Sequence, residues 1–298
     1  MSELALAVDI GGTKMAAGIV DRSGALLHRS QVATPPSGSG ASGGEAAESL
    51  WSTLADLVRD VRGVFARDDV VVCGVGCGGP MSPGGETVSP LNIAGWRDFP
   101  LRRRVQELTG IPVFVDNDAK ALARGEGWIG AAVGQRNFLG MVVSTGVGGG
   151  LFMDGRLLHG RLGNAGHIGH VIVVPDGRAC VCGGQGCLEA EASGRSVEAI
   201  TGKPAALAPS VVVERTGTLV GRAVASVANL LDFPLAVISG SVALGYGAPF
   251  FAAAQREVEL RCGLAFARGT TVVPGALGDR GPLIGAAAVG WAGLGEPA

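Results

Sequence analysis

The chain contains 298 residues, enough to bury a large core and to divide into two domains. Hydrophobic residues make up 47% of it and charged residues 17%, which excludes a disordered protein, and the net charge of −2 gives no electrostatic reason to expect a nucleic-acid partner. The first residues lack the basic region and the cleavage site of a secretory signal, so we expect a cytoplasmic protein whose thiols stay reduced.

Apolar runs and turn residues predict the elements of the first half of the chain. We expect strands at residues 4–8, 15–20, 26–33, 70–75 and 112–115, helices at 45–64, 101–108 and 119–130, and a surface loop at 35–44. Gly74, Gly76 and Gly79 match a dinucleotide-binding fingerprint, but the prolines at positions 80 and 83 predict a loop where that fingerprint requires a helix. We therefore expect a glycine-lined pocket wall rather than a Rossmann site.

Residues 9–14 form a glycine turn between the first two expected strands. Such a turn presents backbone N–H groups and the Thr13 hydroxyl to an anion, and Asp9 is placed to hold a magnesium ion or its water. The nucleotide-binding candidates in this turn are Asp9, Gly11, Gly12, Thr13 and Lys14. An ordinary hairpin turn explains the same residues equally well, so the motif alone leaves both interpretations open.

Three polar residues, Asp116, Asn117 and Asp118, follow the strand expected at 112–115 and precede a helix. A carboxylate at a strand-to-helix junction is held rigidly and exposed to a cleft, which is the placement that a catalytic base needs. The alternative is that Asp118 only caps the helix. Because a cap needs one such residue and the chain offers three, we favour a functional role.

The second half repeats the order of strand, glycine turn with a threonine, and strand. We expect strands at 138–143 and 151–153 around a turn at 144–150, in which Thr145 and Gly146 are candidate phosphate-binding residues. Two such turns predict two related domains that hold one polyphosphate.

The rest of the chain alternates between helices and strands. We expect helices at 190–200, 211–231, 249–264 and 283–292 and strands at 235–238 and 270–273. A third glycine turn follows the strand at 235–238, where Gly240 would lie against a nucleotide base or ribose. The uncharged stretch at 235–255 is long enough to span a membrane, but its glycines and Pro249 favour strand, turn and helix instead.

Residues 163–189 contain three of the six cysteines and two of the four histidines. One imidazole and three thiolates suit a closed tetrahedral zinc site with a structural role, and the candidate ligands are His170, Cys180, Cys182 and Cys187. Three cysteines cannot all pair with one another in disulfides, and ordinary buried thiols would not explain their clustering among glycines. We therefore favour structural zinc over these two alternatives.

Taken together, the motifs resemble the ROK family of sugar kinases and repressors over almost the whole chain. The resemblance is carried by Asp9-Ile-Gly-Gly-Thr-Lys14, Asn117-Asp118, the Thr145 turn, and the cysteine pattern from His170 to Glu189. It implies an actin-like α/β fold with two ribonuclease-H-like domains, and with ATP and sugar in the cleft between them. The domains would span residues 1–118, joined by the C-terminal helix 283–298, and 119–282. It also implies a homodimer.

The resemblance implies a role for each motif. Asp118 would take the proton from the sugar 6-hydroxyl, and magnesium and the two glycine turns would neutralise the ATP phosphates. The sugar would contact Gly78, Asn92, Asn117, His167, His170 and Glu189. His170 would use one ring nitrogen for zinc and the other for sugar, so that the metal orients the substrate indirectly.

His167 departs from the commonest family pattern, because glucokinase-like members usually carry Glu at this position. A carboxylate only accepts hydrogen bonds, whereas a neutral imidazole donates one and accepts one. The Gly-His-Ile-Gly-His form resembles the bacterial N-acetylmannosamine kinases of the family, so we expect an N-acylhexosamine substrate, with glucose or N-acetylglucosamine as the alternative. A DNA-binding repressor of the family is less favoured, since such members carry a helix-turn-helix segment before the first turn and only eight residues precede Asp9 here. A sugar-sensing protein without catalysis is also less favoured, because Asp9 and Asp118 are both present.

Overall fold

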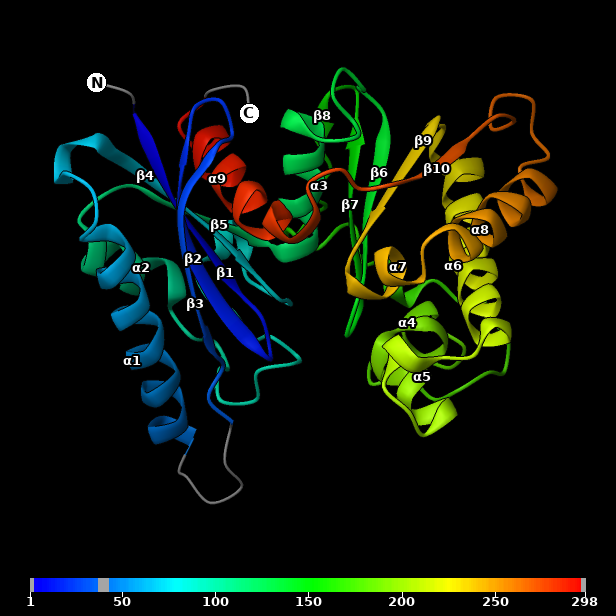
Figure 1. Ribbon diagram of the computed structural model, residues 1–298, viewed down its shortest axis with the longest axis horizontal. Helices are drawn as coiled ribbons and strands as arrows, with labels where there is room; N and C mark the ends of the chain where they lie inside the picture. Colours follow the sequence, from blue (N-terminus) through cyan, green and yellow to red (C-terminus); the bar gives the residue numbers. More distant parts are fainter. Residues whose placement is uncertain (1–2, 37–42, 296–298) are drawn as a thin grey trace. The chain divides into compact units, whose positions relative to one another are not determined.

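The computed structural model describes residues 3–36 and 43–295, so most of the loop expected at 35–44 lies outside the described residues. The chain separates into two compact units, which we describe one at a time (Figure 1). Unit 1 comprises Met1–Ile129, His159–Ala165 and Asp279–Ala298, and unit 2 comprises Gly130–Leu158 and Gly166–Gly278. In the described residues, no helix is both long and apolar enough to cross a bilayer.

Unit 1 is built on a five-stranded sheet with the order β3-β2-β1-β4-β5. Its strands are β1 (Leu4–Ile10), β2 (Lys14–Asp21), β3 (Leu26–Ala33), β4 (Val70–Cys77) and β5 (Val113–Asn117). The first three form antiparallel hairpins, whereas β4 and β5 run parallel to β1. β1 is buried on both faces and is a nearly continuous apolar run, while residues of the edge strand β3 alternate between half-buried and exposed.

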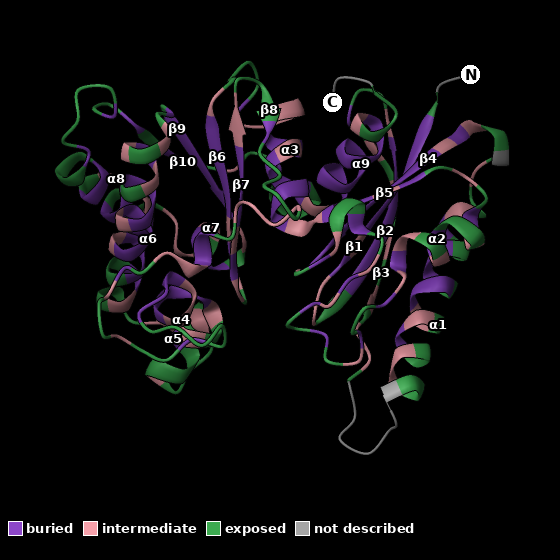
Figure 2. Ribbon diagram, turned by 180° about the vertical axis from the view of Figure 1, so that it is seen from behind, coloured by how far each residue is buried: buried purple, intermediate pink, exposed green. Residues whose placement is uncertain are grey.

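Helices cover both faces of this sheet. α1 (Gly43–Arg62) and α2 (Leu101–Thr109) share one apolar cluster with Leu6 and Val8 of β1, and α9 (Gly281–Gly293) shares another with Ala5 and Ala7. α9 is buried almost all round (Figure 2). A Cβ atom on Gly74 of β4 would lie 1.8 Å from the Ala286 carbonyl oxygen. The expected pocket wall is therefore wrong for Gly74, which is small so that α9 can pack directly on the sheet.

α3 (Asp118–Ile129) completes unit 1. It packs so closely on α9 that a Cβ atom on Gly285 would lie 2.4 Å from the carbonyl oxygen of Ala121. The structure thus places α3 with the first unit, whereas we expected the second domain to begin at residue 119.

Unit 2 has a second five-stranded sheet, with the order β10-β9-β6-β7-β8. Its elements are β6 (Phe138–Val143), β7 (Val147–Met153), β8 (Arg156–Leu157), β9 (Leu235–Ser239), β10 (Thr271–Pro274), α4 (Leu188–Ala192), α5 (Gly194–Thr201), α6 (Ser210–Leu231), α7 (Ser241–Tyr246) and α8 (Ala248–Arg261). Short 3-10 helices occur in both units, at Arg67–Asp69, Pro83–Gly85, Ile168–His170, Ala205–Leu207 and Gly278–Arg280. The glycines of α6 let it pack closely on α8, since Cβ atoms on Gly217 and Gly221 would each lie 2.3 Å from a carbonyl oxygen of that helix.

The two sheets have the same topology. β6, β7 and β8 form antiparallel pairs in the same order as β1, β2 and β3, and β9 and β10 continue in parallel as β4 and β5 do. This correspondence agrees with the internal repeat that the two glycine turns predicted.

Two expected elements of unit 2 differ from the structure. The turn after β6 ends at Gly146, so the glycines at 148–150 lie in β7, where the position of a Cβ on Gly149 is 3.0 Å from the Gly140 carbonyl oxygen of the paired strand. The helix expected at 190–200 is divided at Ser193, whose hydroxyl accepts the N–H of Ser196 and so starts α5 as a separate helix.

Candidate functional site

The turn between β1 and β2 is a tight hairpin braced from two sides. The N–H of Gly11 donates to the Lys14 carbonyl at 3.0 Å, and the Thr34 hydroxyl donates to the Gly11 carbonyl at 2.7 Å. A Cβ on Gly12 would lie 2.8 Å from the backbone carbonyl oxygen of Asn92. Glycine is therefore required for this turn to contact Asn92, and the side chain of Asn92 reaches within 3.1 Å of where a Cβ on Gly78 would be. Three of the predicted site residues thus lie together.

Two acidic residues, Asp9 and Asp118, lie close together beside this turn. A Cβ on Gly76 of β4 would lie 3.6 Å from both Asp9 Oδ1 and the Cα of Asp118. Burial and, to a lesser extent, the negative charge of Asp118 raise the pKa of Asp9 to about 7, against the opposing effect of Lys14. A divalent cation beside Asp9 would relieve this repulsion, so the residues present fit a magnesium ion.

At the junction of β5 and α3, two neighbouring side chains accept the same backbone N–H of the helix. Asn117 precedes the first residue of the helix, and its side-chain oxygen accepts the N–H of Ala119 at 3.1 Å. Asp118 also accepts this N–H, at 2.8 Å, and is itself only half-buried. The N–H of Ala119 thus has two acceptors, so the start of α3 does not depend on Asp118 alone.

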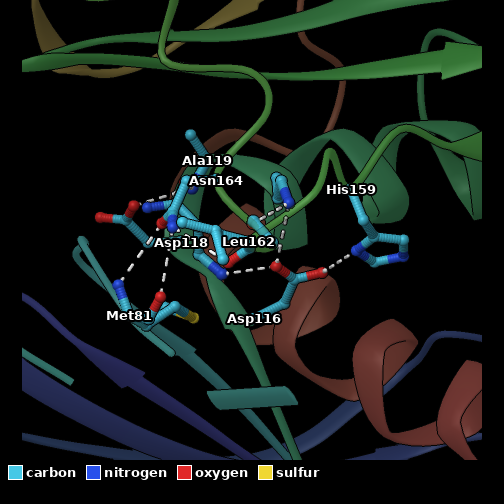
Figure 3. A network of polar contacts seen from close by, with 10 residues as sticks. Met81, Asp116, Asp118, Ala119, His159, Leu162 and Asn164 are labelled. Atoms are coloured by element: carbon cyan, nitrogen blue, oxygen red, sulfur yellow. Dashed lines mark hydrogen bonds and ion pairs between the residues drawn. The ribbon is translucent and has the colours of Figure 1, made fainter. Parts of the chain in front are cut away.

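Behind this junction lies a polar cluster that the sequence reasoning missed (Figure 3). Lys120 is 1% exposed, and its ammonium group donates to the Gly163 carbonyl at 2.6 Å and lies 3.6 Å from Asp116. Burial lowers the pKa of Lys120, while Asp116 raises it. His159 Nδ1 lies 4.0 Å from the other Asp116 oxygen. The cluster therefore holds residues 159–165 on α3.

The same segment is tied to the loop after β4. The Asn164 side chain accepts the Met81 N–H at 3.4 Å and donates to the Met81 carbonyl at 3.2 Å, so its amide pairs with both backbone groups (Figure 3). No motif marks these contacts. The spacing of Asp116 and Lys120 across the strand-to-helix junction was the one available signal.

In unit 2 the glycine turn between β6 and β7 is held by side chains from distant segments. The Ser144 hydroxyl lies 2.9 Å from that of Ser241, and the Ser144 carbonyl accepts the Gly194 N–H at 2.7 Å. Gly240 has a φ of 101°, and a Cβ there would lie 2.4 Å from the Val143 carbonyl oxygen. Thr145 is exposed. The structure thus brings the predicted nucleotide-binding residues of unit 2 together.

Glu189 of α4 also reaches this turn. Its Oε2 accepts the Val147 N–H at 2.9 Å and lies 2.8 Å from where a Cβ on Gly146 would be. We expected Glu189 to contact sugar hydroxyls, and in the structure its carboxylate accepts a backbone N–H of the turn.

The four candidate metal ligands form one cluster in unit 2. The ligand atoms of His170, Cys180, Cys182 and Cys187 all lie within 4.8 Å of one another. His170 Nδ1 lies 3.7 Å from Cys180 Sγ, and the sulfurs of Cys182 and Cys187 are also 3.7 Å apart. Ligands at about 2.3 Å from a tetrahedral zinc ion are separated by about 3.8 Å, so the spacing fits this metal.

The thiols agree with this assignment. None of the six cysteines is in a disulfide. The backbone N–H of Gly184 lowers the pKa of Cys182, whereas burial and the neighbouring thiols raise that of Cys187 to about 12. A dication would stabilise the thiolates that crowd one another here. The exposed His167 ring stacks beside His170, with centroids 6.0 Å apart.

The family model described as ROK family matches residues 5–291, which is nearly the whole chain. The chain belongs to the ROK family. This confirms the resemblance that the motifs predicted, and residues of both units contribute to it.

Two curated relatives are named for different sugars. The glucokinase of Streptomyces coelicolor is 38% identical over 65% of this chain, and the match spans 57% of that relative's length. The N-acetylmannosamine kinase of Yersinia pseudotuberculosis is 34% identical over 81% of this chain and 84% of its own.

Solved ROK structures confirm the fold. The structure of a ROK family glucokinase from Streptomyces griseus, in complex with glucose and AMPPNP, superposes with a TM-score of 0.82 at 31% identity, covering 96% of this chain and 99% of the other. The ROK hexokinase of Thermus thermophilus gives a TM-score of 0.77 at 32% identity, covering 98% and 100%. The chain therefore has the actin-like α/β fold that we expected.

Proposed function

We propose that this ROK protein is an ATP-dependent kinase that phosphorylates the 6-hydroxyl of a hexose or hexosamine. Asp118 carries the proposal, because it is presented at the first position of α3 and the N–H of Ala119 has a second acceptor in Asn117. The carboxylate takes the proton of the sugar 6-hydroxyl, and the oxygen attacks the γ-phosphorus in line. The N–H groups and hydroxyls of the turns at residues 9–14 and 144–146 bind the phosphates. When bound by Asp9, magnesium supplies the positive charge that ATP requires.

The test of this function is the variant Asp118→Asn. Loss of a general base lowers kcat by about 10²- to 10⁴-fold, while sugar binding, measured by calorimetry, changes little. Asp56→Asn, on the exposed side of α1, serves as a matched control and keeps full turnover. Undiminished turnover in Asp118→Asn would overturn the assignment.

We propose that the four-residue cluster of unit 2 binds one structural zinc ion. His170 would ligate through Nδ1, the nitrogen nearest to Cys180, which leaves Nε2 for the sugar. Metal analysis of the purified protein should find about one zinc ion per chain. Retention of that zinc by the double variant Cys180→Ser with Cys182→Ser would refute the site.

For the sugar we propose N-acetylmannosamine, with glucose or N-acetylglucosamine as the alternative. The relative named for N-acetylmannosamine matches more of this chain than the relative named for glucose, although its identity is lower. The imidazole of His167 both donates and accepts, which suits an N-acyl group better than a carboxylate does. The glucokinase relatives keep the second sugar as a specific alternative.

A coupled assay of glucose, mannose, N-acetylglucosamine and N-acetylmannosamine decides between these sugars. N-Acetylmannosamine should give the highest kcat/KM, and His167→Glu should shift the ratio toward glucose by about 10-fold. A wild-type preference for glucose would contradict the role of His167. We further propose that the chain forms a homodimer, which light scattering would test.

A further inference from the structure

The short helix α4 carries two carboxylates that bind two different loops of unit 2. Glu189 accepts the Val147 N–H of the turn after β6, as described above. Glu191 accepts the Arg178 N–H at 2.6 Å, and Arg178 lies two residues before the candidate ligand Cys180. The first contact braces the turn that is proposed above to bind phosphate, whereas the second has no role in that function.

Both oxygens of Glu191 are occupied by donors. Oε1 accepts the N–H of Arg178, while Oε2 accepts Arg215 Nη2 of α6 at 2.5 Å. Glu191 is only 2% exposed, so each of these donors replaces water that the carboxylate has lost. A Cβ on Gly177 would lie 2.5 Å from Oε1 of Glu191. The lack of a side chain at position 177 therefore allows the backbone before Arg178 to approach this carboxylate.

α6 holds the same loop at a second point. Arg222 lies two helical turns after Arg215, on the same side of α6. Its Nη1 donates to the Val173 carbonyl at 3.0 Å, and its Nε donates to Glu257 at 2.9 Å. Two arginines therefore hold the segment between His170 and Cys180, one directly and one through Glu191.

We propose that Glu191 is a positioning residue for the metal centre, which it fixes by holding the Arg178 backbone against Arg215. The inference rests on the proposed zinc site. A loop held in this way presents Cys180 and Cys182 in place before the ion binds, so that ion loss requires the loop to break buried hydrogen bonds. Substitution of a residue that orients metal ligands typically lowers the metal affinity by about 10- to 100-fold.

The decisive variant is Glu191→Gln. A glutamine has one acceptor oxygen and one NH₂ group, so it must aim a donor at either the Arg178 N–H or the Arg215 guanidinium. We expect a chelator to extract zinc from this variant about 10-fold faster than from the wild type, at a temperature well below unfolding. Arg215→Lys keeps the charge but cannot make both bonds of the guanidinium, so it should fall in between.

Glu257→Gln is the matched control. Glu257 is buried between α6 and α8, and a single oxygen accepts both Arg222 Nε and Arg261 Nε. A glutamine at position 257 can therefore present its oxygen to both arginines and turn its NH₂ group away. We expect this variant to release zinc at the wild-type rate.

Hydrogen exchange of residues 171–187 in the metal-free protein gives a readout that does not depend on activity. Glu191→Gln should exchange faster there than the wild type, and Glu257→Gln should not. A wild type that contains no zinc would refute the metal site itself. If the wild type contains zinc but loses it to the chelator as fast as Glu191→Gln does, this inference alone is overturned. The same holds if Glu257→Gln loses its zinc as fast as Glu191→Gln.

Discussion

The two sheets share one strand order, yet their first turns are surrounded by different chemistry. The turn after β1 lies beside the carboxylates of Asp9 and Asp118 and is braced by the backbone of Asn92. The turn after β6 is bordered by the hydroxyls of Ser144 and Ser241 and is braced by the side chain of Glu189. The repeated frame thus carries two neighbouring aspartates beside the turn of unit 1, and two hydroxyls with one glutamate beside the turn of unit 2.

The largest expected effect compares one glycine in each turn. Gly12→Ala places a Cβ 2.8 Å from a backbone carbonyl oxygen, which cannot move without shifting the Asn92 loop, so we expect kcat/KM to fall by about 10²-fold. Gly146→Ala places a Cβ 2.8 Å from Glu189 Oε2, the end of a flexible side chain, and should cost only about 10-fold. Steady-state kinetics with ATP and sugar varied in turn measures both. Equal losses would show that the two turns are braced with the same stiffness.

The next largest effect concerns the buried ammonium behind the acidic turn. Lys120→Met removes the ammonium group that forms an ion pair with the buried Asp116 and should lower the free energy of unfolding by about 3 kcal/mol in urea titrations. Hydrogen exchange should rise in α3 and residues 159–165 and stay unchanged around the turn of unit 2. Lys203→Met, at an exposed position, is the control and should change stability little. A uniform rise in both units would contradict a local role for Lys120.

The smallest effect is a pH dependence in the same cluster. Burial lowers the pKa of His159 from 6.5, Lys120 and Arg124 lower it further, and Asp116 opposes them. The unfolded chain therefore binds more protons than the folded chain between the lowered pKa and 6.5, so stability rises with pH through that window. Between about pH 7 and about pH 5 the wild type should lose more unfolding free energy than His159→Gln. The difference is small because the His159 side chain is 56% exposed, and identical pH profiles would exclude it.

Local patterns were enough to predict most of the fold. The apolar spacing of Leu50, Leu54 and Leu57 predicted α1, and the buried runs predicted β1 and β4, because each signal depends only on nearby residues. The glycines at 148–150 were misplaced because glycine marks both a turn and a strand that packs tightly on its neighbour. Gly74 was also misplaced, because it packs on α9, which lies at the other end of the sequence and leaves no local signal.

The candidate site divides in the same way. Asp9, Asp118 and the cysteines occur in compact motifs, so they could be singled out as candidates from the sequence, and the family resemblance supplied the roles proposed for them. Lys120, Asn164, Glu191 and Arg215 act through partners far along the chain, and a single sequence does not show such pairs. The structure was also needed to show that Asn117 and Asp118 both accept the N–H of Ala119 at the start of α3.

The packing of α9 has a consequence for synthesis. The strands β1, β2 and β3 are translated before unit 2, but one face of their sheet is covered by α9, which is translated after all of unit 2. Until then Ala5, Ala7 and Val72 lack this helix, and unit 2 can fold while unit 1 remains incomplete. Unit 1 is therefore completed late, by contacts between residues far apart in the sequence, and does not fold fully as it is synthesised. A ribosome-stalled chain lacking α9 should therefore show protease-sensitive N-terminal strands beside a resistant second unit.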